Sequence, residues 1–191
     1  TDRLIQAAES ATDPEADYET AVQQLRNQAL DTCAELLENP AALRDVIETS
    51  VGEILDLLRG VRIAGTCPAS THDLISGIGE TWSAQLFCNH LWERGVEAAY
   101  LDTREVLVVE QRATGPAVLW EPTAANAQQW FADQPAQIVV ITGYIARASD
   151  GTATTLRRNG SDYSASIFGK LLSADSITIW TDVAGVMSAR S

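Results

Sequence analysis

Two neighbouring segments, QIVVITGYI at residues 137–145 and SDYSASIFGKLLS at residues 161–173, decide the fold class. The first is rich in β-branched residues, which indicates a strand, and the second repeats its apolar residues at helical spacing. The alternation continues to both sides with expected strands EAAYL (97–101), EVLVVE (105–110) and SITIWTDV (176–183) and an expected helix TAANAQQWFAD (123–133). Strands alternating with helices favour parallel pairing and an α/β sandwich. Ligands bind such sheets where the carboxyl ends of strands meet helix N-termini.

The first 60 residues, by contrast, are predicted to be helical. Apolar residues recur every three to four positions in two stripes, which are separated by Glu38, Asn39 and Pro40, and the second helix is expected to end at Gly60. The stripes comprise Val22, Leu25, Ala29, Cys33, Leu36 and Leu37, then Leu43, Val46, Ile47, Val51, Ile54, Leu55 and Leu58. Such stripes indicate packing faces, and they equally suit a docking face for another subunit.

The segment PASTHDLISGIGETWSAQLFCNHLWERG, residues 68–95, joins the two parts. Its pattern predicts a helix interrupted near Gly77 and Gly79 and a second helix from Glu80 to Arg94. Gly95 is expected at the C-terminal end of that second helix. We therefore divide a single expected domain, residues 1–191, into a helical segment (1–60) and an α/β part (61–191).

Composition excludes several classes of function. A formal net charge of −13 argues against nucleic-acid binding, which needs a basic face, although a local site for a phosphorylated small molecule remains compatible with it. No apolar run reaches the roughly 20 residues of a membrane span, and no signal peptide opens the chain. Cys33, Cys67 and Cys88 are too widely spaced for a disulfide framework or a CxxC metal pair. They predict reduced, mostly buried thiols in a cytoplasmic protein.

The stretch RNGSD, residues 158–162, carries the densest chemistry at an expected loop-to-helix junction. Gly160 would let the backbone approach a ligand closely. Ser161 or Asp162 would cap the helix, the free amides of its first turn favour an anion, and Arg158 offers a fork suited to a carboxylate or phosphate. The same residues also suit an ordinary helix cap beside a solvated arginine, and both interpretations stay open.

Two weaker signals accompany this stretch. Glu80 comes after two glycines at an expected helix start, where a capping role is also compatible. Thr181 and Asp182 lie where an expected buried strand ends, which is a usual place for a nucleotide contact.

Five segments in order, GETWSAQL, AAYLDTREVLVV, VVITGYIAR, GTATTLRRNGSDYSA and SITIWTDVAGV, together resemble the catalytic domain of the aspartokinases in the amino-acid-kinase family. They look most like the aspartokinase half of bifunctional aspartokinase/homoserine dehydrogenases, and Ala184 is similar to the methionine-branch type. The resemblance implies a carbamate-kinase-like fold, a three-layer α/β/α sandwich around a mostly parallel sheet. It also implies an incomplete domain, because these kinases begin with a strand and a lysine-bearing glycine loop. The only lysine here is Lys170, in the helix after RNGSD.

The resemblance further implies transfer of the ATP γ-phosphoryl group to the β-carboxylate of L-aspartate, with Mg²⁺. Glu80 would hold the ammonium of aspartate and Arg158 its α-carboxylate, while Ser161 and Asp162 would line the same pocket. Arg158 and Asp162 are the expected catalytic residues, Thr181 and Asp182 would face the nucleotide, and no residue is assigned to a metal. The expected partners are L-aspartate, ATP and further copies of the chain, with neither nucleic acid nor membrane. A homoserine dehydrogenase domain in a longer parent chain is compatible with the resemblance.

Two residues depart from the family pattern. Arg157 stands where the family usually has glycine, which would crowd the loop, and Met187 replaces a common tyrosine near the nucleotide. With the lysine loop missing, the 191 residues alone are expected to be inactive. Two alternatives stay open: a relative acting on glutamate, carbamate or a nucleotide, and a non-catalytic module that serves oligomerisation or regulation.

Overall fold

The computed structural model describes residues 2–157 and 159–180. The described chain begins with four helices, α1 (Asp2–Ser10), α2 (Tyr18–Leu36), α3 (Ala41–Ala64) and α4 (Ala69–Glu93). Strands and shorter helices come next: β1 (Ala98–Leu101), α5 (Thr103–Val106), β2 (Val108–Arg112), β3 (Gly115–Val118), α6 (Trp120–Ala132), β4 (Ile138–Ile141), β5 (Ile145–Ala148), β6 (Ala153–Thr155) and α7 (Gly160–Leu171).

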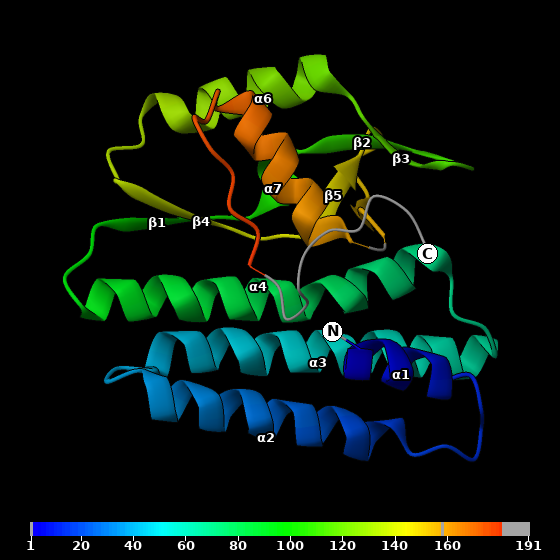
Figure 1. Cartoon of the computed structure of the whole chain (residues 1–191). Coiled ribbons are helices and arrows are strands. Elements are labelled where there is room, and N and C mark those ends of the chain that lie inside the picture. The colour runs from blue at the N-terminus through cyan, green and yellow to red at the C-terminus, as the bar shows by residue number, and fades with distance from the viewer. Residues whose placement is uncertain (1, 158, 181–191) are drawn as a thin grey trace, which may run out of the picture.

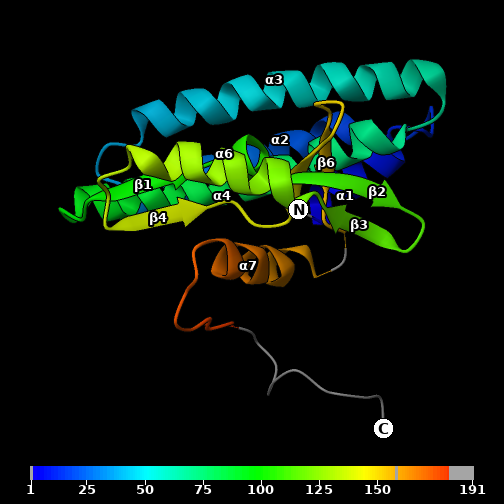
Figure 2. The ribbon, with the colours of Figure 1, turned by 90° about the horizontal axis from the view of Figure 1, so that it is seen from above.

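The elements stack in layers (Figure 1). Helices α1, α2 and α3 lie below α4, the strands lie above it, and α6 lies beyond the strands, while α7 runs in front of them. Seen from above, α7 lies beside the strands on the side away from α3 (Figure 2). Helix α4 therefore covers one face of the strands and α6 and α7 cover another, which agrees with the expected α/β/α sandwich. The remaining helices add a layer beneath it.

The strands form two short sheets. In the first, β1 and β4 pair in parallel from Ala98 opposite Ile138 to Leu101 opposite Ile141. The second has the order β3-β2-β5-β6, with β2 parallel to β5 and the two outer pairs antiparallel. The expected mostly parallel sheet is thus divided, because the chain turns between β4 and β5 instead of continuing as one strand through residues 137–145.

Most residues of the two apolar stripes of the helical segment lie on packing faces, as the spacing predicts, but Leu36 and Val46 are exposed, at 46% and 38%. Val22, Ile47, Ile54 and Leu58 are at most 1% exposed and belong to one core shared with α1 and α4. The helical layer is also fastened at its end by Arg62, whose guanidinium donates to three backbone oxygens, those of Ala11, Pro14 and Ala16.

Helix α3 continues past Gly60, so the expected end at that residue was wrong. Leu58 and Val61 on either side of Gly60 are buried, and their packing outweighs the cost of about 1 kcal/mol that glycine adds to a helix interior. The helix stops at Gly65, which has a φ of +66° and donates its N–H to the Val61 carbonyl. Gly95, with a φ of +75°, comes after α4 in the position that the sequence predicts.

The interruption expected near Gly77 and Gly79 is also absent, because α4 is one helix from Ala69 to Glu93. The reason lies in how closely α4 approaches β5. A Cβ atom at Gly77 would lie 2.7 Å from Cγ2 of Ile145, a buried and β-branched side chain. Gly77 therefore provides room between helix and sheet, and it does not end the helix.

Short elements and their boundaries account for the other differences from expectation. Strand β2 begins at Val108 because Asp102 caps the short helix α5 by accepting from the Arg104 N–H. Strands β3 and β6 were not predicted, since the β2–β3 hairpin turns through Ala113 and Thr114 without the usual Asn-Gly signal. Residues 176–180, expected to begin a strand, form none in the described part of the chain.

Helix α7 holds the two sheets together through consecutive residues. Ile167 packs with Leu107, Val109 and Ala146 of the β2–β5 sheet. Phe168 packs with Leu101 of β1 and with Ala127 of α6. Burying side chains of this size stabilises a protein by about 1.5–3 kcal/mol each. Helix α7, which begins at Gly160 within the RNGSD stretch, is therefore held in place by its packing against both sheets.

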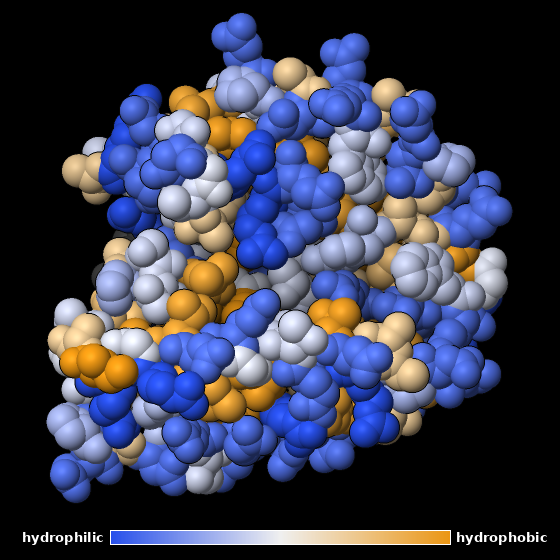
Figure 3. Space-filling view, turned by 180° about the vertical axis from the view of Figure 1, so that it is seen from behind, coloured by the Kyte–Doolittle hydropathy of each residue, from blue (hydrophilic) through white to orange (hydrophobic). Residues whose placement is uncertain are grey.

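No helix in the described residues is both long and apolar enough to cross a membrane. On the face opposite to that of Figure 1, hydrophilic residues cover most of the surface, and hydrophobic residues show as separate patches (Figure 3). All three cysteines are free, and burial raises the pKa of the Cys33 and Cys88 thiols above its ordinary value. Burial therefore keeps them in the thiol form.

Replacing Gly77 by alanine tests the close approach of α4. The new Cβ gains about 1 kcal/mol of helix propensity, and the clash with Ile145 costs about 1–3 kcal/mol. We expect Gly77→Ala to lower the free energy of unfolding in urea by about 1 kcal/mol. Gly52→Ala in α3 is the matched control, since a Cβ there meets nothing within 4 Å and should stabilise the protein. Stabilisation by both variants would contradict this account of Gly77.

Candidate functional site

The site is built at the carboxyl end of the parallel pair β1 and β4. Thr103, after β1, donates its N–H to Thr142 Oγ1 at 2.8 Å, and the Thr103 hydroxyl donates to the Thr142 carbonyl. Both threonines are at most 1% exposed. This pair of bonds fixes the turn Thr142–Gly143–Tyr144 that leads from β4 into β5.

The N-terminus of α7 rests on that turn. A Cβ at Gly143 would lie 3.0 Å from Cβ of Ser161, and one at Gly160 would lie 2.9 Å from Cδ2 of Tyr144 and from Cβ of Leu156. The expectation that Gly160 makes room for a ligand is therefore corrected, because Gly160 is buried and makes room for Tyr144 and Leu156. The close fit places Ser161 directly over the end of β4.

A buried hydroxyl, that of Ser164, connects the turn to the helix. The Tyr144 N–H donates to Ser164 Oγ at 3.0 Å, and the hydroxyl donates to the Gly160 carbonyl at 2.8 Å. Tyr144 has a φ of +69°, a conformation that costs a non-glycine residue free energy and that these contacts help to hold. Sequence reasoning missed both residues, although Ser164 lies one helical turn after Gly160 on the face that should be buried.

The helix cap differs from the expected one. The N-cap residue is Asn159, in a left-handed conformation with a φ of +59° and without a side-chain capping bond, so neither Ser161 nor Asp162 caps the helix. Both lie in the first turn of α7 and are exposed. The first amides of a helix have no partner within it, and together with the helix dipole they favour an anionic ligand. A hydroxyl and a carboxylate thus stand at a helix N-terminus, where the dipole favours negative charge.

Arg157, which stands where the family usually has glycine, adopts a backbone conformation that favours glycine. Its φ is +61°, in the left-handed region where glycine is at ease and other residues are strained by about 1–2 kcal/mol. The arginine side chain itself is exposed. The crowding expected from Arg157 is therefore a backbone strain and not a blocked loop.

Glu80 lies inside α4 and not at a helix start, which corrects its expected capping position. It is half-buried and lies three residues after Gly77, on the face of α4 that approaches β5. The structure thus joins Ser161 and Asp162 at one helix end and places Glu80 on the sheet side of α4. The other expected site residues, Arg158, Thr181 and Asp182, lie outside the described residues, as do Ala184 and Met187.

Two further polar groups are occupied elsewhere. The Arg104 guanidinium of the LDTRE segment bonds both oxygens of Asp102, and this pairing raises the pKa of Arg104 above its ordinary value. Lys170 lies in the last turn of α7, where its Nζ is 3.9 Å from the centre of the Trp120 ring. Ten residues of helix, about 15 Å, separate Lys170 from Gly160, so it does not serve the helix N-terminus.

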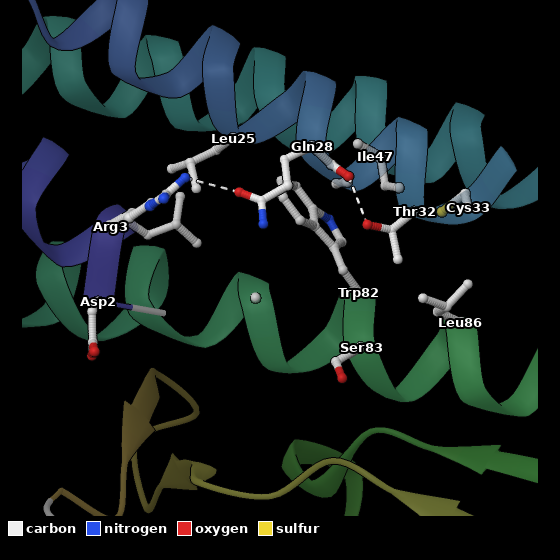
Figure 4. Close-up of a pocket in the computed structure, with 13 residues that line it drawn as sticks. Asp2, Arg3, Leu25, Gln28, Thr32, Cys33, Ile47, Trp82, Ser83 and Leu86 are labelled. Atoms are coloured by element: carbon white, nitrogen blue, oxygen red, sulfur yellow. Dashed lines mark hydrogen bonds between the residues drawn. The ribbon is translucent and has the colours of Figure 1, made fainter. Parts of the chain in front are cut away.

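A cavity of about 540 Å³ in the helical layer is separate from these residues (Figure 4). It is bounded by α1, α2, α3 and α4, and Figure 4 shows Arg3, Gln28 and Trp82 beside it. None of the expected site residues that are described lines it. Gly79 and Ser83 of α4 face this cavity, whereas Gly77 faces the sheet.

Strain at Arg157 predicts the effect of glycine there. Arg157→Gly should be more stable than Arg157→Ala by about 1 kcal/mol, because both remove the side chain and only glycine relieves the left-handed strain. The free energy of unfolding of the two variants, measured side by side in urea, checks this. Equal stability, or a more stable alanine variant, would contradict the strain at this position.

The bridging role of Ser164 predicts a second difference. Ser164→Ala leaves the part-buried Tyr144 N–H without its acceptor and should lower the free energy of unfolding by about 1 kcal/mol or more. Ser166→Ala is the matched control, because Ser166 is exposed and makes the same kind of bond, to the Asp162 carbonyl. The control should change stability by about 0.5 kcal/mol or less. A similar loss in both variants would refute the bridge.

The family model described as "Amino acid kinase family" matches residues 2–191. A bifunctional aspartokinase/homoserine dehydrogenase 2, chloroplastic, from Zea mays is 38% identical over 97% of this chain and 20% of its own length. Bifunctional aspartokinase/homoserine dehydrogenase 2 from Escherichia coli is 38% identical over 87% of this chain and likewise 20% of its own length. This chain thus spans about a fifth of the length of these curated relatives.

Among solved structures, Escherichia coli aspartokinase III in complex with aspartate and ADP superimposes with a TM-score of 0.84 and 27% identity. The match covers 96% of this chain and 40% of that one. These findings confirm the fold class and the resemblance to aspartokinases that the five segments predict. The chain belongs to the amino acid kinase family.

Proposed function

We propose that the chain is part of an aspartokinase catalytic domain and contributes the aspartate-binding half of its active site. The reaction is transfer of the ATP γ-phosphoryl group to the β-carboxylate of L-aspartate, which gives 4-phospho-L-aspartate. The observation that carries the proposal is the exposed pair Ser161 and Asp162 at the start of α7, above the carboxyl end of β4. Its support is the likeness to an aspartokinase solved with aspartate and ADP.

Each proposed role rests on charge. Glu80 attracts the ammonium of aspartate, and Arg158 holds its α-carboxylate as a bidentate cation. Ser161 offers a hydroxyl and Asp162 a carboxylate at the helix N-terminus, where the amides favour the anionic part of the substrate. Phosphoryl transfer depends mainly on positioning and on neutralising negative charge, so residues that hold both substrates account for most of the catalysis.

The nucleotide half of the proposal rests on Thr181 and Asp182, which lie outside the described residues. ATP and Mg²⁺ therefore remain proposals, and no group of three or more potential ligands in the described part of the chain could hold a metal ion. We also propose a methionine-branch enzyme from Ala184, a cytoplasmic location, self-association and a fused homoserine dehydrogenase. The last is supported by the bifunctional relatives.

One observation favours a second candidate, a non-catalytic module of the same family. Arg157 keeps a strained left-handed conformation next to the proposed substrate clamp. Strain of this kind costs about 1–3 kcal/mol and must be held by the surrounding structure, so the arginine adds a cost beside the clamp that the glycine of the family pattern would avoid. The two candidates differ in whether the site binds its substrate.

Calorimetric titration with L-aspartate distinguishes them. We expect the chain to bind L-aspartate, and we expect Arg158→Ala and Glu80→Gln each to weaken binding about tenfold or more, since charge-assisted contacts of this kind contribute roughly 1.5–3 kcal/mol. Arg112→Ala is the control, because Arg112 is an exposed cation paired with Glu110 on β2. Absence of aspartate binding by the folded chain would favour the non-catalytic module.

The reaction itself is tested by a coupled assay of ADP release on the full-length gene product that contains this chain. Release should depend on L-aspartate and should fall in both site variants. ADP release that does not depend on L-aspartate would contradict the proposed reaction. Equal loss of affinity for ATP and L-aspartate in Arg158→Ala would contradict the proposed role of Arg158 in binding the α-carboxylate.

A further inference from the structure

A polar cluster joins α4 to the strand that precedes the RNGSD stretch. Asp73, in the second turn of α4, accepts a hydrogen bond from the Thr154 hydroxyl at 2.8 Å on Oδ2 and one from the Thr155 hydroxyl at 3.2 Å on Oδ1. Both threonines belong to β6 and are buried, at 6% and 1% exposure. Each carboxylate oxygen of Asp73 therefore engages a different residue of the same short strand.

Gln111 of β2 also belongs to the cluster, although β5 lies between β2 and β6 in the sheet. Its Nε2 donates to Thr154 Oγ1 at 2.9 Å and to the Thr155 carbonyl at 3.0 Å. His72 adds a ring nitrogen 3.9 Å from Oδ1 of Asp73. The side chains of three elements, α4, β2 and β6, thus meet at two consecutive threonines.

Strand β6 needs such support because its backbone offers little. It has three residues, and within the described part of the chain it lies at the edge of its sheet and pairs with β5 alone. Strands this short and open on one side are marginal by themselves. The two bonds from Thr154 and Thr155 to Asp73 attach the strand to α4.

Strand β6 leads directly into the connection that ends at α7, and this gives its attachment a wider effect. After Thr155, the chain passes through Leu156, whose N–H donates to the Tyr144 carbonyl at 2.7 Å, and then through the left-handed residues Arg157 and Asn159 into α7. On α4, Glu80 lies seven residues after Asp73, two helical turns, and so occupies the same face. Asp73 therefore links the helix of Glu80 to the connection that carries Arg158.

We propose that Asp73 is a positioning residue, which holds the β6–α7 connection against α4 and thereby sets the aspartate-binding residues of the two segments relative to each other. The part that concerns aspartate rests on the proposed function. Asp73 acts through Thr154 and Thr155 and has no contact with substrate in this role. Its geometry uses both carboxylate oxygens, one for each threonine, and an amide at this position would keep one of the two acceptors.

Two measurements on the 191-residue chain test the proposal. Hydrogen exchange reports the opening of residues 154–160, with α2 as an internal reference, and calorimetric titration reports the affinity for L-aspartate. In Asp73→Ala we expect exchange in 154–160 to accelerate about tenfold or more and aspartate binding to weaken about tenfold, since bonds to a charged acceptor are lost. Exchange in α2 should stay unchanged.

Matched variants separate positioning from general destabilisation. Asp73→Asn keeps the shape and one carbonyl acceptor and should restore most of both properties. Thr155→Val removes one of the two bonds without touching Asp73, so it keeps the proposal testable if Asp73→Ala does not fold, and it should accelerate exchange in 154–160 alone. Asp56→Ala, which removes an exposed carboxylate that pairs with Arg59 on α3, should change neither property.

The outcomes distinguish this proposal from the proposed function. If the unmodified chain does not bind L-aspartate, the proposed function fails, and the exchange rates alone decide whether Asp73 holds the connection. Unchanged exchange in residues 154–160, or equal acceleration in α2, overturns the positioning role. Faster exchange in residues 154–160 of Asp73→Ala with unchanged affinity for L-aspartate overturns the proposed effect of Asp73 on substrate binding.

Discussion

Helix α4 packs against the helical layer through one face and against the strands through another, and the rest of the molecule depends on this double contact. On the strand side, the missing side chain of Gly77 lets the helix come within contact of Ile145. On the other side, Ile75 and Trp82 of α4 belong to the large core of the helical layer. Because protein interiors are close-packed, moving α4 would disturb both cores together.

The second constraint is the close packing of the N-terminus of α7 against the turn after β4. Gly143, Gly160 and Ser164 act together there: two glycines allow contact between chain segments, and one hydroxyl accepts the part-buried N–H of Tyr144. The left-handed conformations of Tyr144 and Asn159 accompany this contact. Local strain is thus held by packing, which is the usual condition for its persistence at functional sites.

These two constraints position the proposed aspartate site from opposite directions. Glu80 belongs to α4, and Ser161 and Asp162 belong to α7. The strands between them keep the two helices apart and oriented, and Asp73 adds a direct attachment near the start of the connection to α7. The proposed substrate, an anion with an ammonium group, suits a carboxylate on α4 together with the helix N-terminus of α7.

The sequence by itself determined the class of fold, the helical nature of the first 60 residues and the buried faces of α2 and α3, because hydrophobic periodicity is a local property of the chain. It also identified the family, through five ordered segments. It wrongly predicted a helix end at Gly60 and an interruption near Gly77 and Gly79, because a glycine that ends a helix and one that tertiary packing keeps inside a helix look alike in one dimension.

Only the tertiary structure decided which glycines serve packing, that α7 begins after a left-handed Asn159 without a side-chain cap, and that Ser164 bonds Tyr144 and Asp73 bonds Thr154 and Thr155. Thr154 and Asp73 are 81 residues apart in the chain, and no local pattern connects them. The same holds for β3 and β6, which are stabilised by partners across the sheet and not by their own sequence. Contacts between distant segments set these features, since their free energy arises only when the segments meet.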